Sequence, residues 1–498
     1  MISFFVNSLR LTRLGFSLLL HGVPVQAMLI ASGRKSPRLE KRLGKNLVGW
    51  LQNSGPSFIK LGQILSTRPD ITGDIISEEL SLLRDKLPPF STPEVLKIIE
   101  SELGGKYTDF YEDIESKPVA AASIAQVHRA VTINQDLVAI KVLRPGIAKK
   151  FRQDIALFYF VAGFVNKFVP KAYRLRLKEV IKSLEKTVQM ELDLRYEAAS
   201  AERIRENVKG DSGIKIPKIF WKLTSKEVLT MSWVEGIPVN DKKALVKQGH
   251  DLEDVSKKLA TSFFNQAYRD GFFHADLHPG NLFVDKDGDI VMVDFGITGS
   301  LAKADRLFVA EVLYCFIKRN YSRIADLHFK YGIIPASEDK DKFALACQAI
   351  GEPVVGMPVN KISMGKLLKQ LLDVSGDFNV RPQIQFLLLQ KTLVTIEGVG
   401  QSIYPDVNMW RLVEPWIKKW AKQNFGYRAK LKEASQDLRE FIIKLPHALA
   451  TFNDVVELGQ NYLLTVKEHK RSKKSSYIGS LALAAVAGAL VAFYALNI

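Results

Sequence analysis

Hydrophobic positions along this chain change their spacing several times, and each change predicts a different element. A capping residue at Thr92, a proline directly after it and the pair Gly104-Gly105 delimit one helix. Short β-prone runs follow at 125–133 and 137–143, and the three polar residues between them predict a hairpin. Helical spacing then continues to about Val208.

Beyond that point the pattern returns to short strands and then becomes helical. Four more strands are predicted, at 215–221, 227–234, 281–285 and 289–294. The segment 241–270 has helical spacing, and so has almost everything after Ser300. A small mixed sheet followed by a helical region is an α+β fold, with function expected where the two meet.

The end of the chain has the pattern of a membrane span. Residues 477–498 contain no charged side chain, and as a helix they would be about 33 Å long, enough for one bilayer crossing. The preceding residues, 467–476, carry five Lys or Arg and one Glu, which the positive-inside rule keeps in the cytoplasm. One transmembrane helix is therefore predicted. Small residues at Ala484, Gly488 and Ala492 leave open whether two such helices pair as a homodimer.

The beginning of the chain is apolar with charged interruptions. Arg10 and Arg13 lie inside the apolar stretch and no clean cleavage site follows, which argues against a signal peptide. An amphipathic helix that lies on a membrane or on the rest of the protein fits better. Tryptophans mixed with basic residues at 410–430 fit either an interfacial helix or a solvated helix with core-facing tryptophans.

Composition narrows the class of protein further. The formal net charge of +17 favours anionic partners such as nucleotides or a membrane, although a solubilising surface explains it equally well. No zinc-knuckle or RNA-binding aromatic pattern accompanies the basic residues, so nucleic acid is not an expected partner. The two cysteines, Cys315 and Cys347, exclude a disulfide scaffold and a thiolate zinc site.

Residues suited to phosphoryl transfer stand in two neighbouring motifs, FHADLHPGNL at 273–282 and VDFG at 293–296. The reaction needs one carboxylate that orients the nucleophile and oxygen ligands for the metal on the phosphates. The spacing assigns the catalytic role to Asp276 and the metal to Asn281 and Asp294, because Mg²⁺ prefers oxygen ligands.

Upstream, VAIK at 138–141 lies in the second strand of the predicted hairpin. Lys141 would pair with the α and β phosphates of a nucleotide and with a helical glutamate. Together with the two downstream motifs it predicts a protein-kinase-like fold. His278 is predicted to shape its turn, since Pro279 breaks the helix that a metal site shared with His274 would need.

The surroundings of these motifs resemble the UbiB family of atypical kinases. No glycine-rich phosphate loop is present, and PVAAASIAQVH stands in its place at 118–128. FIKLGQ at 58–63 matches the KxGQ element of that family, and ELDLRYEAA at 191–199 matches its ExD element. The resemblance covers about residues 30–400 and implies a bilobal, protein-kinase-like fold with an N-terminal helical extension.

The resemblance also implies roles for individual residues. Glu197 would be the ion-pair partner of Lys141, and ATP or ADP would bind with Mg²⁺. The loop around the phosphates would consist of Ala120, Ala121, Ala122 and Ser123. The residues regulating the cleft would be Lys60, Gln63, Glu191 and Asp193. His274 would brace the catalytic loop. Because Asp193 and Glu197 are four residues apart, we expect them to share one helix face, away from Glu191.

The expected organisation follows from these assignments. In chain order, it comprises an amphipathic segment at 1–35, the helical KxGQ extension at 36–117, an N-lobe with inserted helices at 118–235, a helical C-lobe at 236–435, a basic juxtamembrane helix at 436–476 and the transmembrane helix at 477–498. No Ala-Pro-Glu segment follows Asp294, which argues against phosphorylation of proteins in trans.

The leading hypothesis is a membrane-anchored, Mg-dependent atypical kinase or ATPase that supports ubiquinone biosynthesis. The resemblance alone implies this pathway, together with a place in the bacterial inner membrane and a cytoplasmic catalytic domain. Expected partners are membrane lipids, prenylated quinone precursors and other enzymes of the pathway. Two alternatives stay open: a small-molecule or lipid kinase that phosphorylates an isoprenoid or phenolic acceptor, and a nucleotide-switched scaffold.

Overall fold

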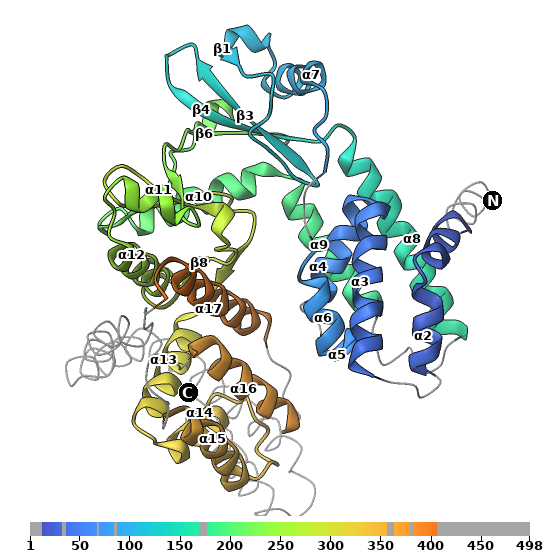
Figure 1. Cartoon of the computed structure of the whole chain (residues 1–498), viewed down its shortest axis with the longest axis vertical. Coiled ribbons are helices and arrows are strands. Elements are labelled where there is room, and N and C mark those ends of the chain that lie inside the picture. Colours follow the sequence, from blue (N-terminus) through green and yellow to red (C-terminus); the bar gives the residue numbers. More distant parts are fainter. Residues whose placement is uncertain are drawn as a thin grey trace, which may run out of the picture. The chain divides into compact units, whose positions relative to one another are not determined.

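The structure is a computed structural model that describes residues 12–31, 36–66, 69–83, 87–168, 177–355, 363–378 and 383–405. These residues combine many helices with three small sheets, so the predicted α+β class is confirmed (Figure 1). Within them, no helix is both long and apolar enough to cross a bilayer. The predicted transmembrane helix at 477–498, the juxtamembrane helix at 436–476 and the stretch at 410–430 lie outside the described residues.

Helices at the start of the chain pack on one another and leave large apolar side chains in solvent. Residues 12–20 are helical, and the next elements are α2 (Val23–Ala31), α3 (Pro37–Ser54), α4 (Pro56–Ser66), α5 (Pro69–Thr72) and α6 (Asp74–Leu80). α3 packs against α2, α4 and α6, and Asn46 of α3 donates a hydrogen bond to Gln26 of α2. The exposed apolar residues of the first two helices are Phe16, Leu19, Leu20, Val25 and Met28.

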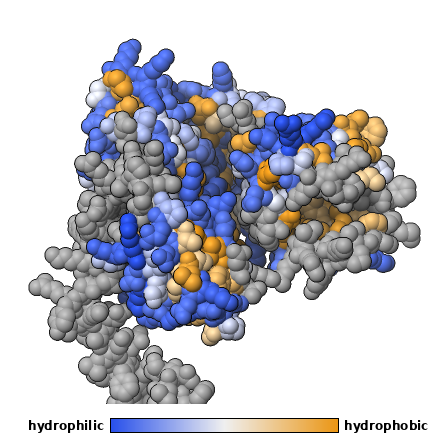
Figure 2. All heavy atoms as spheres, turned by 60° about the horizontal axis from the view of Figure 1, so that its bottom comes forward, coloured by the Kyte–Doolittle hydropathy of each residue, from blue (hydrophilic) through white to orange (hydrophobic). Residues whose placement is uncertain are grey.

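Within the predicted amphipathic segment at 1–35, the described α2 packs on α3, and residues 12–31 still present apolar surface. Val23 and Gln26 are buried, whereas Leu20 is 73% exposed and Met28 is 75% exposed. Figure 2 shows that hydrophobic patches interrupt a mostly hydrophilic surface on the face it displays. Exposed apolar patches of this kind mark contact with another protein or with a membrane.

The first sheet is antiparallel. Its strands are β1 (Tyr111–Ile114), β2 (Ala120–Ala121), β3 (Ala125–Thr132), β4 (Leu137–Leu143) and β6 (Val228–Ser232). They pair in the order β1-β3-β4-β6, with β2 against β3. One face carries a core formed with α7 (Thr92–Leu103), which includes Val95, Ile99, Tyr111, Val138, Ile140 and Val142. Because side chains alternate along a strand, Lys141 lies on the opposite face of β4. The predicted hairpin of β3 and β4 is confirmed.

α7 begins differently from the prediction. Its N-cap is Ser91, which forms a reciprocal capping box with Glu94, while the Thr92 hydroxyl donates to the carbonyl of Ser116 at 2.9 Å. Thr92 is therefore the first helical residue and not the cap. The helix ends at Gly104 in the left-handed conformation, as predicted. Since α7 and β1 pack on the sheet, the sheet unit begins before the expected boundary at residue 118.

In the described part of the chain, three α-helices lie between β4 and β6. They are α8 (Ile147–Phe168), α9 (Leu177–Glu191) and α10 (Leu194–Asn207), and α4 packs against α8 and α9. The helical conformation is interrupted between α9 and α10. There Asp193 is extended and caps α10 by accepting from the Arg195 amide. The expectation that Asp193 and Glu197 share one helix face is therefore wrong, because Asp193 precedes the helix.

The remaining elements form two small sheets and a group of helices. The second sheet has the order β5 (Ile214–Lys215), β10 (Ile290–Met292), β9 (Leu282–Val284) and β7 (Ile237–Pro238), and β8 (Phe272–His274) pairs with β11 (Thr298–Ser300). Short 3₁₀ turns are η1 (Tyr107–Asp109), η3 (Trp221–Leu223) and η5 (Pro279–Asn281). Of the strand predicted at 215–221, only β5 and an isolated bridge at Ile219 form.

Helices of the C-lobe surround these sheets. Before the predicted catalytic loop at 274–281 come α11 (Lys242–Lys247), α12 (Leu252–Phe264) and the π-helix η4 (Asn265–Asp270). After it come α13 (Lys303–Ile317), α14 (Tyr321–Lys330), α15 (Lys340–Val355), α16 (Met364–Asp377) and α17 (Ile384–Ile403). The π-helix directly precedes β8, and the Gln266 side chain in it accepts from the His274 amide at 3.1 Å. This contact links the end of the helix to the strand that enters the catalytic loop.

Candidate active site

Lys141 forms a nearly buried ion pair with Glu197 of α10. The Lys141 Nζ is 2.8 and 2.9 Å from the two carboxylate oxygens, and the side chains are only 12% and 7% exposed. Burial raises the pKa of Glu197 to about 7, against the opposing effect of Lys141. Burial would lower the pKa of Lys141, but the carboxylates of Asp294 and Glu197 raise it above its ordinary value. The lysine is therefore a permanent cation.

Asp294 reaches the same lysine from the turn after β10. Its Oδ1 is 3.2 Å from the Lys141 Nζ, and that positive charge holds the pKa of Asp294 well below its usual range. Its backbone is left-handed, with φ of 61°, which is costly for a residue other than glycine. The neighbouring Phe295 is buried, and its ring centroid lies 5.2 Å from that of His274. The carboxylate remains 51% exposed and ionised, as a metal ligand must be.

His274 braces the catalytic loop from inside the protein. Its Nε2 donates to the Val293 carbonyl at 3.0 Å, and its Nδ1 accepts from the Asp276 amide at 3.1 Å. Because one ring nitrogen donates and the other accepts, the imidazole is neutral, and burial lowers its pKa further. The expected bracing role is confirmed. His278 shapes the turn as predicted, with its Nδ1 accepting from the Gly280 amide at 3.0 Å.

The predicted metal ligands lie at neighbouring ends of the β9–β10 hairpin. The Val293 amide donates to the Asn281 carbonyl at 3.0 Å, which places Asn281 beside the residue preceding Asp294. The Asn281 side-chain nitrogen donates to the Asp276 carbonyl at 3.1 Å, so its amide oxygen is the atom left for a ligand. An amide oxygen and an ionised carboxylate are the donors that Mg²⁺ prefers, and the residues present therefore fit this metal.

The Asp276 carboxylate lies between a lysine and a histidine side chain. Its side chain is 31% exposed, with His278 Nε2 at 3.9 Å from Oδ2 and Lys391 Nζ at 3.7 Å from Oδ1. Lys391 belongs to α17, and sequence reasoning missed it. The available signal was its charge, since Glu397 is the only other charged residue of α17.

The alanine loop is a tight hairpin and not an open phosphate loop. β2 contains Ala120 and Ala121, and the Ala122 amide donates to the Ala125 carbonyl at 2.8 Å. The Arg144 guanidinium donates to the Ala122 carbonyl at 3.1 and 2.8 Å, which ties the loop to the end of β4. Ser123 is fully buried and its hydroxyl has no hydrogen-bond partner within the described chain, so a ligand oxygen would satisfy it.

Of the regulatory set, the structure brings Lys60 and Glu191 together. The Lys60 Nζ is 2.9 and 3.0 Å from the two Glu191 carboxylate oxygens, and both side chains are almost buried. The pair joins α4 to the last residue of α9. Asp193 instead caps α10 and forms a bidentate pair with Arg195 at 2.7 and 2.8 Å. Gln63 lies on α4, one turn after Lys60, and is half-buried.

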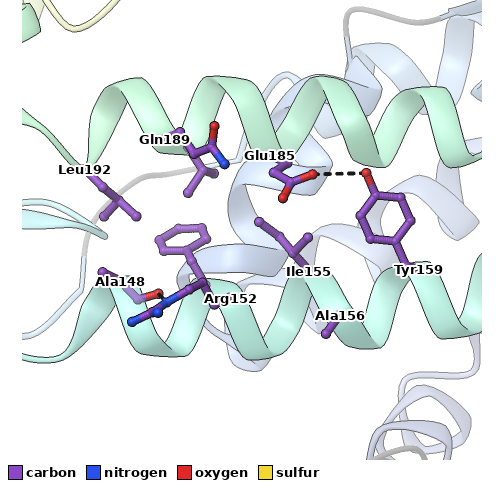
Figure 3. Close-up of a pocket in the computed structure, with 10 residues that line it drawn as sticks. Ala148, Arg152, Ile155, Ala156, Tyr159, Glu185, Gln189 and Leu192 are labelled. Carbon is purple, nitrogen blue, oxygen red and sulfur yellow. Dashed lines mark hydrogen bonds between the residues drawn. The ribbon is translucent and has the colours of Figure 1, made fainter.

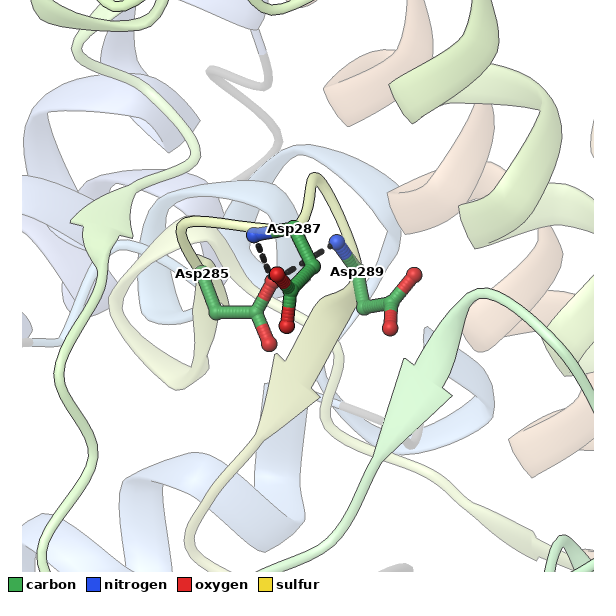
Figure 4. Close-up of side chains that lie close together, drawn as sticks. All are labelled: Asp285, Asp287 and Asp289. Carbon is green, nitrogen blue, oxygen red and sulfur yellow. Dashed lines mark hydrogen bonds between the residues drawn. The ribbon is translucent and has the colours of Figure 1, made fainter.

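A second acidic cluster stands at the other end of the same hairpin. Asp285, Asp287 and Asp289 bring their carboxylates within 4.8 Å of one another, and Asp285 accepts from the amides of the other two (Figure 4). The Lys215 Nζ lies 2.6, 2.8 and 3.2 Å from the three side chains. The Lys258 Nζ also lies 3.4 Å from Asp289, so all three carboxylates already have ammonium partners, and we assign no metal to this turn.

A hollow between α8 and α9 lies apart from these residues. Its volume is about 220 Å³, and apolar side chains such as Ile155 and Leu192 line it together with Arg152 and Gln189 (Figure 3). At one end the Tyr159 hydroxyl donates to Glu185 at 3.1 Å. None of the predicted catalytic, nucleotide or metal residues lines it. The candidate active site is therefore identified by the contacts among those side chains, and this hollow is not part of it.

The fold and the converging side chains define a protein-kinase-like protein, and comparison with known proteins agrees. The ABC1 atypical kinase-like domain matches residues 82–328, and the UbiB helical domain matches residues 347–408. The solved Rv3197–erythromycin complex from Mycobacterium tuberculosis is 22% identical with a TM-score of 0.50, covering 78% of this chain and 97% of that one. That likeness concerns the fold alone.

Sequence relatives identify the family. Three proteins named probable protein kinase UbiB are similar to this chain. They come from Marinobacter nauticus (38% identical, covering 86% of this chain and 79% of the relative), Azotobacter vinelandii (39%, 80% and 74%) and Pseudomonas fluorescens SBW25 (36%, 90% and 84%). The chain therefore belongs to the UbiB family of atypical kinases.

Proposed function

We propose that this chain binds ATP or ADP with Mg²⁺ and transfers or hydrolyses the terminal phosphoryl group in support of ubiquinone biosynthesis. The observation that carries the proposal is the convergence of Lys141, Glu197 and Asp294 from three separate elements, next to the braced loop of Asp276. A lysine paired with both a helical glutamate and a metal-binding aspartate is what a kinase needs to hold a nucleotide.

Each residue then has a defined task. Lys141 would bind the α and β phosphates, and Asn281 and Asp294 would hold Mg²⁺, which supplies positive charge next to the phosphates when bound. An acceptor oxygen forms its bond to the γ-phosphorus while the bond to the bridging oxygen of ADP breaks. Asp276 orients that acceptor and receives its proton. The hairpin that contains Ala120 and Ala121 would border the phosphates.

The acceptor we propose is water or a small molecule and not a peptide. Only Ile297, β11 and two further residues separate Gly296 from the first residue of α13 at Lys303. This leaves no room for the activation segment on which protein kinases dock a peptide. The same observation favours the second candidate, a kinase that phosphorylates an isoprenoid or phenolic alcohol.

We place this activity at the bacterial inner membrane, with the catalytic domain in the cytoplasm. The exposed apolar residues around Leu20 and Met28 support membrane contact, and so does the uncharged segment predicted to span the bilayer at 477–498. Ubiquinone precursors are prenylated and reside in lipid, so a membrane-bound enzyme would meet them and their biosynthetic enzymes there.

The test is a single assay on the full-length protein in vesicles. ATP labelled at the γ-phosphate is added with Mg²⁺, with and without a prenylated phenol, and the label is separated into phosphate, lipid and protein fractions. Label in free phosphate or lipid, dependent on Mg²⁺ and lost in Asp276→Asn, is the expected result. Label confined to protein would contradict the proposed acceptor, and no turnover in any fraction would contradict the catalytic function.

A further inference from the structure

A helix far along the chain holds the catalytic loop in place. The Thr392 hydroxyl of α17 lies within hydrogen-bond distance of the Leu388 carbonyl, at 2.7 Å, and of the Ala275 carbonyl in the loop, at 3.3 Å. α17 packs against α12 and β11, and its Leu389 and Leu393 are buried. The residue next to Thr392 therefore has a fixed position relative to the loop.

That residue, Lys391, places a cation on the predicted catalytic carboxylate. Its Nζ is 3.7 Å from Asp276 Oδ1, while the His278 imidazole approaches the other oxygen at 3.9 Å. α17 has one other charged residue, Glu397, which is buried and bonded to the start of α16. Glu397 thus serves packing between helices, whereas Lys391 is half-exposed at the site, where solvent and ligands reach it.

We propose that Lys391 is a positioning residue for Asp276, supplied to the phosphoryl-transfer site by the helical end of the fold. The loop itself, HADLHPGN at 274–281, contains no Lys or Arg and so has no permanent cation of its own. A fixed ammonium beside Oδ1 holds the carboxylate in one orientation, in which it can align the acceptor and take its proton. The inference rests on the proposed function, because Asp276 needs an orientation only if it acts on a nucleophile.

Orientation of the Asp276 carboxylate and binding of the nucleotide are assigned to different residues. Lys141, Asn281 and Asp294 hold the nucleotide and metal, and Lys391 contacts none of them in the described structure. Removing its charge should therefore slow the chemical step and leave the bound nucleotide in place. We expect Lys391→Met to lower kcat by about 10- to 100-fold with KM for Mg-ATP within about twofold.

The experiment compares full-length wild type with Lys391→Met, Lys391→Gln, Lys391→Arg and the control Lys369→Met, which removes an exposed lysine of the neighbouring α16. ATP turnover gives kcat and KM. Thermal shifts with Mg-ADP, and with Mg-ADP plus aluminium fluoride as a mimic of the transferring phosphoryl group, give a readout independent of turnover. Thermal melting without ligand checks that each variant is folded. If Lys391→Met does not fold, Lys391→Gln takes its place in the comparison.

The expected pattern has three parts. Lys391→Met and Lys391→Gln lower kcat and lose the extra stabilisation from aluminium fluoride but keep the Mg-ADP shift. Lys391→Arg restores most of both, and Lys369→Met behaves as wild type. Any of three results would overturn the positioning role. They are a wild-type kcat in Lys391→Met, failure of Lys391→Arg to restore activity, and loss of the Mg-ADP shift in Lys391→Met or Lys391→Gln. If wild type itself shows neither turnover nor an Mg-nucleotide shift, the proposed function falls and this role falls with it.

Discussion

The β9–β10 hairpin carries a lysine–carboxylate cluster at each end, and the two ends behave very differently. At one end Lys141 bridges Glu197 and Asp294, which come from three elements of the fold. At the other end Lys215 contacts Asp285, Asp287 and Asp289, which lie within five residues of one turn. The first lysine is 12% exposed and the second is 46% exposed.

The difference shows that carboxylate density does not identify a catalytic site. The three aspartates of the turn all contact Lys215, and Asp285 also accepts from two backbone amides, so these carboxylates already have partners within the chain. The Lys141 end keeps an ionised, half-exposed carboxylate on a strained backbone, with an amide oxygen next to it. Strain and unused ligand capacity, and not the number of acids, mark the place where an ion and a nucleotide would be stabilised.

The strongest test of this contrast is one substitution made at both ends. Asp294→Asn should lower Mg-dependent ATP turnover by about 10³-fold, because the metal loses its charged ligand while side-chain size is kept. The matched control, Asp287→Asn, removes one carboxylate from the turn and should leave turnover within about twofold. Steady-state hydrolysis measures both. Equal losses at the two ends would erase the distinction.

The pH dependence of the free energy of unfolding also distinguishes the two clusters. The folded state holds the Glu197 proton more tightly than the unfolded chain, since burial raises its pKa from 4.5 to about 7. The contribution of Glu197 to the free energy of unfolding therefore falls as pH rises through this window, by up to about 3 kcal/mol. Urea unfolding at several pH values should show this slope in wild type and not in Glu197→Gln. The exposed Glu253→Gln is the control and should keep the slope.

The turn should give the opposite sign in the same titration. Burial disfavours the Asp285 charge, but bonds from Lys215 and from the Asp289 amide outweigh it and keep the pKa of Asp285 below 3.8. Its contribution is therefore complete at neutral pH and is lost only as pH falls below that ordinary value. A Lys215-dependent loss of stability between pH 5 and 7 would contradict this.

The smallest expected effect concerns Lys215. Lys215→Met should reduce the free energy of unfolding by roughly 1 kcal/mol, because partly exposed ion pairs contribute little each. ATP turnover should stay at the wild-type value, since the turn takes no part in the chemistry. Chemical unfolding and turnover are measured on the same preparation. A loss of turnover without a loss of stability would assign the turn a function that the geometry does not support.

Sequence patterns located the site better than they located its geometry. Lys141, Asp276, Asn281 and Asp294 stand in ordered motifs, and strand alternation predicts that Lys141 faces away from the core. The break at Asp193 was missed because apolar spacing continues across it, and only the cap geometry reveals two helices. Strands of three or four residues, such as β1 and β8, are too short to show a period.

The contacts that lie furthest apart in sequence could not be predicted at all. Nothing in the spacing of α17 indicates that Lys391 meets Asp276, because the contact depends on how the helical region packs against the loop. The left-handed backbone of Asp294 likewise depends on its surroundings, since aspartate tolerates this conformation better than most residues but seldom adopts it. Tertiary packing, and not local propensity, determines both.

Metal binding is the most direct test of the claim that Asn281 and Asp294 form a nucleotide-dependent cation site. Mn²⁺, used in place of Mg²⁺, can be titrated into the full-length protein with ADP and the free ion followed by electron paramagnetic resonance. We expect ADP-dependent Mn²⁺ binding in wild type and in Asp287→Asn, and its loss in Asp294→Asn. Unchanged Mn²⁺ binding in Asp294→Asn, or its loss in Asp287→Asn alone, would contradict the account.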